Sequence, residues 1–219
     1  MAKKRILILG AGSMARETFF IYKDLGKVDD IHGFVIENFK LKDKKMYGKR
    51  VYDASVIENF KKDSIFVCAI GSPLRKRWVE KLEEKGFRFS SVVHPSVVLN
   101  DSVKLVSGCI ICPGVVLNCH VKIGKHSIIN INSNINHDCL IGNFVTIGPG
   151  VNIAGKVRIG DESWIGIGVT IIHNIKIGKG VFIGAGAVVT NDIPDNMLAF
   201  GVPAKPIRKL TSSDWKKLI

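Results

Sequence analysis

The second half of the chain repeats a six-residue pattern without interruption from Ser96 to Asn191. The fourth place is aliphatic in all sixteen hexads, and the second place holds a small or β-branched residue throughout. Because side chains alternate along a strand, these two places point to the same side. The fifth place is often Gly or Asn, which tolerate the backbone that a corner requires. A six-residue period with a corner in every repeat predicts a parallel β-helix.

Residues 1–95 follow a different pattern, in which short apolar strands alternate with amphipathic helices. We expect strands over 5–9, 31–36 and 65–71, and helices over 16–25 and about 73–85. This alternation predicts a small α/β, Rossmann-like domain with a parallel sheet. His94-Pro95 marks its end, so residues 96–219 form the second domain together with a C-terminal tail.

The first expected strand runs into a glycine turn, Gly10-Ala11-Gly12-Ser13-Met14-Ala15. The turn matches the G-x-G-x-x-A dinucleotide fingerprint, and Glu37 stands at the end of the second strand. A domain of this length cannot build the usual two-half dinucleotide fold. The pattern therefore predicts a smaller phosphate or nucleotide-edge site at a helix N-terminus. A purely structural turn is the alternative.

Composition narrows the range of partners. The formal net charge is +13, spread over both halves without a dense basic block or interleaved aromatic residues. This distribution supports nucleic-acid binding only weakly and fits attraction for small polyanions such as diphosphates equally well. No apolar run approaches the roughly 18 residues that a membrane span needs, and the apolar stretch near the start is too short for a signal peptide. We expect a cytoplasmic protein with no stable membrane insertion and no nucleic-acid partner.

Cysteine and histidine spacing argues against a metal centre. The chain has five cysteines, for which we expect free thiols. Cys109 and Cys112 form a CxxC that lacks a second ligand pair at zinc spacing. His120 and His126 occupy adjacent corners without the third histidine that a β-helical zinc site needs. We therefore expect no metal.

His137 and Asp138 stand together at one of the predicted corners. His137 takes the sixth place of its hexad and Asp138 the first place of the next, so both face outward. Histidine is the side chain best suited to accept a proton near neutral pH, and a neighbouring carboxylate can orient its ring. The pair predicts a general base, with a solvated surface pair as the alternative. Cys139, in a second place, points inward, where a thiol is inert.

The hexapeptide pattern resembles the left-handed β-helix acyltransferase superfamily, in which three hexads make one triangular coil. That resemblance implies association into trimers and a stacking period of 18 residues. It places Gly155 one coil above His137, with no side chain to fill the space. The result would be a slot with a base on its floor and a backbone N–H nearby.

Four further motifs, in order along nearly the whole chain, are LGAGSMA, CAIGSPLRKR, NHDCLIG followed by FVTIGPGVNIAG, and GAGAVVTNDIPDNMLAFGVPAKPIR. Together they resemble the bacterial sugar acyltransferases of the sialic-acid O-acetyltransferase (NeuD) type. The greatest similarity is to the PglD-like N-acetyltransferases, which act on nucleotide-linked 4-amino-4,6-dideoxy sugars. The resemblance implies acetyl-CoA as co-substrate, active sites at the subunit interfaces of a homotrimer, and a task in bacterial surface polysaccharide biosynthesis.

The resemblance also implies roles for individual residues. His137 would be the general base, Asp138 its hydrogen-bonding partner, and Asn130 a polar contact near the reacting amine. The backbone N–H of Gly155 would meet the thioester carbonyl. The remaining acetyl-CoA contacts would come from Thr146, Gly184, Ala185, Gly201, Pro203 and Lys205. The nucleotide pocket would consist of Gly10, Ser13, Met14, Glu37, Gly71, Ser72 and Arg75. Thr146 and Met14 depart from the family, because many relatives have histidine at both positions.

Three hypotheses remain open from the sequence. The leading one is direct N-acetylation of the 4-amino group of a nucleotide-linked sugar, with His137 as the base. The second is O-acetylation of sialic acid or a related sugar, which would leave the nucleotide pocket with little to do. The third is a trimeric β-helix that serves as a binding module without catalysis, since a fold alone proves no function.

Overall fold

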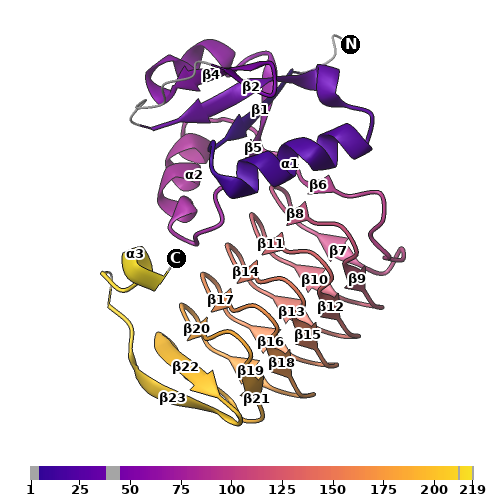
Figure 1. Ribbon diagram of the computed structural model, residues 1–219, viewed down its shortest axis with the longest axis vertical. Helices are drawn as coiled ribbons and strands as arrows, with labels where there is room; N and C mark the ends of the chain where they lie inside the picture. Colours follow the sequence, from indigo (N-terminus) through magenta and orange to yellow (C-terminus); the bar gives the residue numbers. More distant parts are fainter. Residues whose placement is uncertain (1–4, 38–44, 212, 219) are drawn as a thin grey trace.

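The computed structural model describes residues 5–37, 45–211 and 213–218. Figure 1 shows an α/β domain that contains the N-terminus and, next to it along the long axis, a ladder of short strands wound as a three-sided prism. The chain ends in a strand hairpin and a short helix, α3 (Trp215–Leu218). None of the described helices is both long enough and apolar enough to cross a bilayer.

The N-terminal domain is built on a five-stranded sheet in the order β3-β4-β2-β1-β5, parallel except for β3. Its strands are β1 (Arg5–Leu9), β2 (Ile31–Ile36), β3 (Lys45–Met46), β4 (Lys49–Asp53) and β5 (Ser64–Cys68). Its helices are α1 (Ser13–Asp24), η1 (Val28–Asp30), η2 (Ala54–Phe60) and α2 (Arg75–Glu84). Helix α1 packs on the sheet face that carries Ile6 and Ile8, whereas α2 and η2 pack on the opposite face.

The structure has the parallel α/β domain that the sequence predicts, with two additional strands. β3 and β4 form a tight hairpin through Tyr47 and Gly48, which both have a positive φ as such turns require. Their sequence is largely charged and shows no alternation of apolar residues, so the strand signals of the sequence analysis do not detect them. Helix α1 begins at Ser13, directly after the glycine turn.

The prism consists of two-residue strands that stack in three parallel sheets, which we call the first, second and third faces. The first face contains β6 (Val92–Val93), β8 (Ile110–Ile111), β11 (Ile128–Ile129), β14 (Thr146–Ile147), β17 (Trp164–Ile165), β20 (Phe182–Ile183), and the hairpin β22 (Met197–Gly201) and β23 (Ala204–Lys209). The second face contains β9 (Val116–Leu117), β12 (Asn134–Ile135), β15 (Asn152–Ile153), β18 (Thr170–Ile171) and β21 (Val188–Val189). The third face contains β7 (Lys104–Leu105), β10 (Lys122–Ile123), β13 (Leu140–Ile141), β16 (Arg158–Ile159) and β19 (Lys176–Ile177).

Strand pairing confirms the predicted stacking period. Thr146 pairs with Trp164, for example, and Asn134 with Asn152, so each residue lies over the one 18 positions further along. β6 precedes the expected domain boundary at Pro95, yet it already pairs with β8 in the first face.

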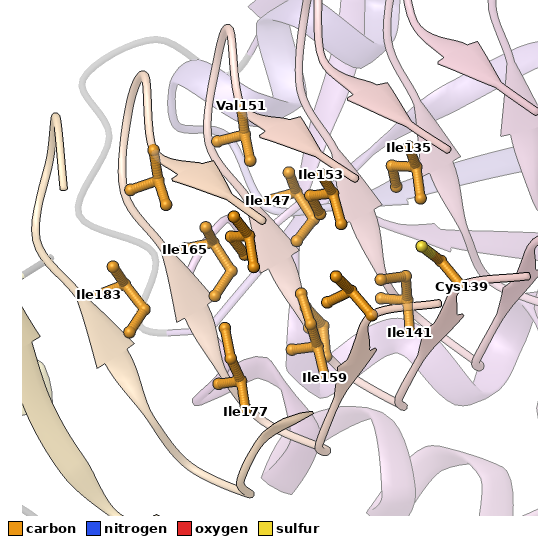
Figure 2. Packing of buried hydrophobic residues seen from close by; sticks show 14 of the residues in the cluster. Ile135, Cys139, Ile141, Ile147, Val151, Ile153, Ile159, Ile165, Ile177 and Ile183 are labelled. Carbon is orange, nitrogen blue, oxygen red and sulfur yellow. The ribbon is translucent and has the colours of Figure 1, made fainter. Parts of the chain in front are cut away.

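The second and fourth places of the hexads fill the inside of the prism. Figure 2 shows the resulting core, in which Ile135, Ile147, Ile153 and Ile165 point towards one another from different faces. From Cys109 onward the residues of both places are buried up to the end of the last coil. Leu99 is the exception among the fourth places, with 42% of its surface exposed, because its hexad lies at the open end of the prism.

Glycine in the fifth place has a different purpose from the one that the sequence suggests. The left-handed backbone of each corner falls on the first place, where every residue from Gly108 to Gly186 has a positive φ. The fifth-place glycines have no such φ. A Cβ on Gly124 would lie 2.5 Å from the carbonyl carbon of Gly142, and one on Gly160 would lie 2.6 Å from that of Gly178. These glycines are needed because successive coils approach one another too closely for a side chain.

The two domains are joined by the side chain of Arg75, the first residue of α2. The guanidinium is buried and donates hydrogen bonds to the His126 carbonyl from Nε (3.1 Å) and Nη2 (2.7 Å), and to the Val145 carbonyl from Nη2 (3.0 Å). Its Nη1 donates to the Gly71 carbonyl and to the Thr146 hydroxyl, both at 2.9 Å. Burial lowers the pKa of Arg75 to about 10, so the group is still charged at neutral pH. Arg75 therefore ties the end of β5 to two successive coils.

His126 completes this junction from the β-helix side. Its ring stacks on Phe144, and its Nε2 lies 2.9 Å from Glu83 Oε1 of α2. Among the described residues, its buried Nδ1 has no hydrogen-bond partner. A proton on Nδ1 would have no acceptor, so the neutral ring donates from Nε2 to Glu83. Burial lowers the pKa of His126, although the carboxylate of Glu83 works in the opposite direction.

We predict that His126 makes the stability of the protein depend on pH. The unfolded chain binds the proton near the ordinary pKa of 6.5, and the folded protein binds it only at lower pH. The contribution of the neutral ring to stability is thus complete above pH 6.5 and is lost as pH falls through the folded pKa, by at most about 1.4 kcal/mol per pH unit. Chemical denaturation of His126→Asn should show a smaller loss below pH 6.5 than the wild type. Asparagine tolerates the positive φ at this corner.

The exposed His173 offers a control, because His173→Asn should leave the slope of the wild type unchanged. An equal pH dependence in the wild type and in His126→Asn would show that the ring of His126 is not responsible.

Candidate functional site

His137 and Asp138 lie on the edge between the second and third faces, with half-exposed side chains. The corner turns between β12 and β13, and the backbone of Asp138 takes the left-handed conformation there, with φ +61°. The His137 Nδ1 is 2.9 Å from Asp138 Oδ2, and the two side chains are 48% and 45% exposed. The hexad frame alone predicts this outward orientation.

The charge on Asp138 decides which ring nitrogen carries the proton. The hydrogen bond from His137 is the main cause that lowers the pKa of Asp138, and the positive charges of His120 and Lys156 lower it further. An ionised carboxylate only accepts hydrogen bonds, so Nδ1 of His137 is the donor. In the neutral ring, Nε2 is then left with a free lone pair, which is the arrangement that a general base requires.

Gly155 forms the surface on which the His137 ring lies. A Cβ at Gly155 would be 2.5 Å from both Cε1 and Nε2 of that ring, so any side chain here would displace it. The carbonyls of His137 and Gly155 accept hydrogen bonds from the next coil, from Lys156 N–H and Asn174 N–H. Among the hydrogen bonds of the described residues, the Gly155 N–H donates to none. An unused backbone donor therefore lies beside the free ring nitrogen.

A cleft of about 470 Å³ lies between the glycine turn of the N-terminal domain and the first face of the prism. Seven of the residues expected to bind substrate or cofactor meet there: Gly10, Ser13, Met14, Gly71, Ser72, Asn130 and Thr146. Gly10 has φ +109°, and a Cβ there would lie 2.9 Å from the Ala69 carbonyl oxygen, so the turn requires glycine. The N-terminus of α1 therefore opens towards the cleft, as the fingerprint predicts.

Two residues expected in the nucleotide pocket lie elsewhere. Arg75 does not line this cleft, because its guanidinium is buried in the domain junction and bonded to carbonyls of the prism. Glu37 lines a separate cavity of about 490 Å³ together with Arg77, Trp78 and Lys81 of α2. The sequence analysis does not single out Trp164, which also lines the cleft. The stacking period could have identified it, since Trp164 lies 18 residues after Thr146.

The cleft and the His137 edge are not adjacent within one chain. Asn130 and Gly148 stand on the edge between the first and second faces, and His137 stands on the next edge along the chain. The whole second face separates them. Gly184 and Ala185 follow β20 on the same edge as Asn130, and Gly201, Pro203 and Lys205 lie in the β22–β23 hairpin.

The described part of the chain contains no group of three or more His, Cys, Asp or Glu side chains that could hold a metal ion. All five cysteines are free thiols. Cys139 is buried inside the prism, where its Sγ donates to the Ala154 carbonyl at 3.1 Å, and burial raises the pKa of its thiol.

Comparisons with known proteins identify the repeat. The family model "bacterial transferase hexapeptide (six repeats)" matches residues 156–191. No protein with curated function matches the chain by sequence.

Several solved structures match over almost the full length. PerB from Caulobacter crescentus in complex with CoA and GDP-perosamine is 30% identical, with a TM-score of 0.85 over 94% of this chain and 99% of that one. The acetyltransferase domain of PglB from Neisseria gonorrhoeae FA1090, in complex with acetyl coenzyme A, is 28% identical, with a TM-score of 0.85 over 94% and 100%. WeeI from Acinetobacter baumannii AYE is 29% identical, with a TM-score of 0.85 over 93% and 100%. These likenesses confirm the fold class, a small α/β domain followed by a left-handed parallel β-helix.

We predict that Gly155→Ala displaces the His137 ring without unfolding the protein. The new methyl group would overlap Nε2 and Cε1, and the exposed ring can swing outward, which breaks its hydrogen bond to Asp138. A crystal structure of the variant should show the new rotamer, and the free energy of unfolding should fall by less than about 1 kcal/mol. An unmoved ring in that crystal structure would contradict the close contact described above.

Proposed function

The chain belongs to the bacterial hexapeptide-repeat sugar N-acetyltransferases, and from this membership we propose its reaction. It transfers the acetyl group of acetyl-CoA to the 4-amino group of a nucleotide-linked 4-amino-4,6-dideoxy sugar. The Caulobacter relative with bound CoA and GDP-perosamine supports this donor and this class of acceptor. The observation that carries the proposal is the His137 ring, held by Asp138 and lying against Gly155.

His137 acts as the general base in this proposal. Its Nε2 takes a proton from the amine as the amine nitrogen attacks the carbonyl carbon of the thioester. The ionised Asp138 stabilises the imidazolium that forms and keeps the ring in the correct tautomer. No covalent acetyl-enzyme is needed, because the nearby Cys139 thiol is buried with a raised pKa.

The N–H of Gly155 stabilises the oxyanion of the tetrahedral intermediate. Oxyanion donors of this kind are typically worth about 3–4 kcal/mol. The intermediate collapses by breaking the C–S bond, and the imidazolium returns its proton to the departing CoA thiolate. A further part of the acceleration comes from holding the amine and the thioester together, a task that falls to the cleft of the N-terminal domain.

Because the cleft and His137 occupy different edges, we propose that the active site is completed between subunits of a homotrimer. The cleft of one subunit would then face the His137 edge of its neighbour. Exposed aliphatic side chains around the second face support this arrangement. Val116 is 37% exposed on the face itself, Ile131 is 44% exposed on one of its edges, and Ile172 is 36% exposed on the other.

We predict a particle of three 24.0 kDa subunits in solution. Ile131→Glu should dissociate it and abolish turnover, because the substitution places a charge in the proposed contact. Val106→Glu is the matched control, since Val106 is 50% exposed on the edge between the third and first faces. Analytical ultracentrifugation and activity should both be unchanged for it. A fully active monomer would contradict the shared active site.

We predict that His137→Ala lowers turnover at least ~100-fold and leaves KM little altered, because the base acts only in the transition state. The measurement is release of CoA thiol from acetyl-CoA in the presence of a panel of nucleotide-linked amino sugars. His173→Ala, an exposed histidine two coils along the same edge, should retain wild-type turnover. Unchanged turnover in His137→Ala would remove this residue from the mechanism.

A further inference from the structure

Thr146 lies at the point where the cleft, the prism and the N-terminal domain meet. It belongs to β14 on the first face, and only 1% of its surface is exposed. Its hydroxyl donates to the Gly71 carbonyl at 2.7 Å and accepts from Arg75 Nη1 at 2.9 Å. The single hydroxyl hydrogen is thus committed to Gly71, which leaves no proton with which Thr146 could donate to a ligand.

Arg75 holds the same carbonyl from the other side. Its Nη1 donates to the Gly71 oxygen at 2.9 Å, while Nε and Nη2 anchor the guanidinium on the carbonyls of His126 and Val145. Both donors to Gly71 are therefore fixed to the prism, Thr146 by its place in β14 and Arg75 by the hydrogen bonds at the junction. Arg75 itself does not line the cleft.

The carbonyl that they hold belongs to a wall of the cleft with little support of its own. Gly71 follows the end of β5 and lines the cleft with Ser72. A Cβ at Gly71 would meet no atom within 4 Å, so one side of this residue is open. Because a peptide unit is planar and trans, fixing the Gly71 C=O towards the prism also fixes the direction of the Ser72 N–H, which points the opposite way. Among the described residues, this N–H donates to no protein acceptor.

We propose that Thr146 and Arg75 are positioning residues for the nucleotide part of the acceptor. They fix the Gly71–Ser72 peptide so that its N–H and the glycine turn at Gly10 present a preformed surface to the diphosphate. The inference rests on the proposed function, and it gives Thr146 a role different from the contact with acetyl-CoA that the family resemblance implies. Neither residue touches the reacting atoms in this proposal.

Thr146→Val tests the role of the hydroxyl, because valine keeps the shape of the side chain and removes both hydrogen bonds. We expect KM for the nucleotide-linked sugar, and Kd for the corresponding free nucleoside diphosphate, to rise at least ~10-fold. KM for acetyl-CoA and kcat should stay within about twofold of the wild type. Thr146→Ser should restore KM to within about threefold, since serine restores the hydroxyl. Thr190→Val is the matched control, because the Thr190 hydroxyl bonds only to its neighbour Asn191.

A double-mutant cycle with Arg75→Lys separates positioning from direct contact. If Thr146 acts through Gly71, Arg75→Lys also raises KM for the nucleotide-linked sugar, and the double variant is little worse than either single one. Additive effects, or an unchanged KM in Arg75→Lys, would mean that Thr146 contacts the ligand itself and would overturn the proposal. A thermal unfolding scan and the KM for acetyl-CoA of each variant show whether it is folded. If Arg75→Lys does not fold, rescue by Thr146→Ser and the KM-against-kcat split decide alone.

Titration of the wild type with UDP, GDP and dTDP keeps this inference distinct from the proposed function. If the wild type binds none of them, the nucleotide-linked acceptor is wrong, and the positioning role falls with it. If the wild type binds one of them and Thr146→Val binds it equally well, the positioning role alone is refuted.

Discussion

The hydrogen bonds between successive coils determine the position of every functional group on the prism. In each strand an N–H donates to the carbonyl 17 residues further on, as from Ile128 to Val145 or from Asn134 to Val151. The coils lie so close together that the fifth place of many hexads admits only glycine. This spacing leaves no freedom for one coil to slide over the next. The imidazole of His137 therefore lies directly against Gly155, and Thr146 beside Trp164, for the same physical reason.

The junction between the domains adds a second constraint, of a different kind. A buried guanidinium without a carboxylate partner is an uncommon way to join two domains, because burial of a charge is costly unless every donor is bonded. Arg75 meets this condition with carbonyl oxygens of the prism, the Gly71 carbonyl and the Thr146 hydroxyl. Carbonyl groups have fixed directions in a stacked coil, so the orientation of α2, and with it one wall of the cleft, follows from the prism.

The sequence predicts the parts of the molecule that depend on local periodicity. The hexads predict the prism, the burial of their second and fourth places, and the outward orientation of His137, because each follows from side-chain alternation within six residues. The glycine turn likewise predicts the end of β1 and the start of α1. The position of Arg75 could not be predicted in this way, because its partners lie 51 to 71 residues away and belong to another domain. The separation of the cleft from His137 depends on the order of the faces around the prism, which becomes apparent once the triangular cross-section is known.

The unbroken ladder of coils restricts how a chain of this type can change in length. Deleting or duplicating one complete turn of 18 residues keeps each side chain on its own edge and changes the height of the prism by one strand spacing, about 4.8 Å. An insertion of any other length has to leave the prism as a loop, or it moves all later residues to the wrong edge or turns them inside out. The separation between the N-terminal domain and the hairpin at the far end is therefore quantised. Descendants of this chain can lengthen or shorten it only in steps of whole coils, much as a column is built from identical drums.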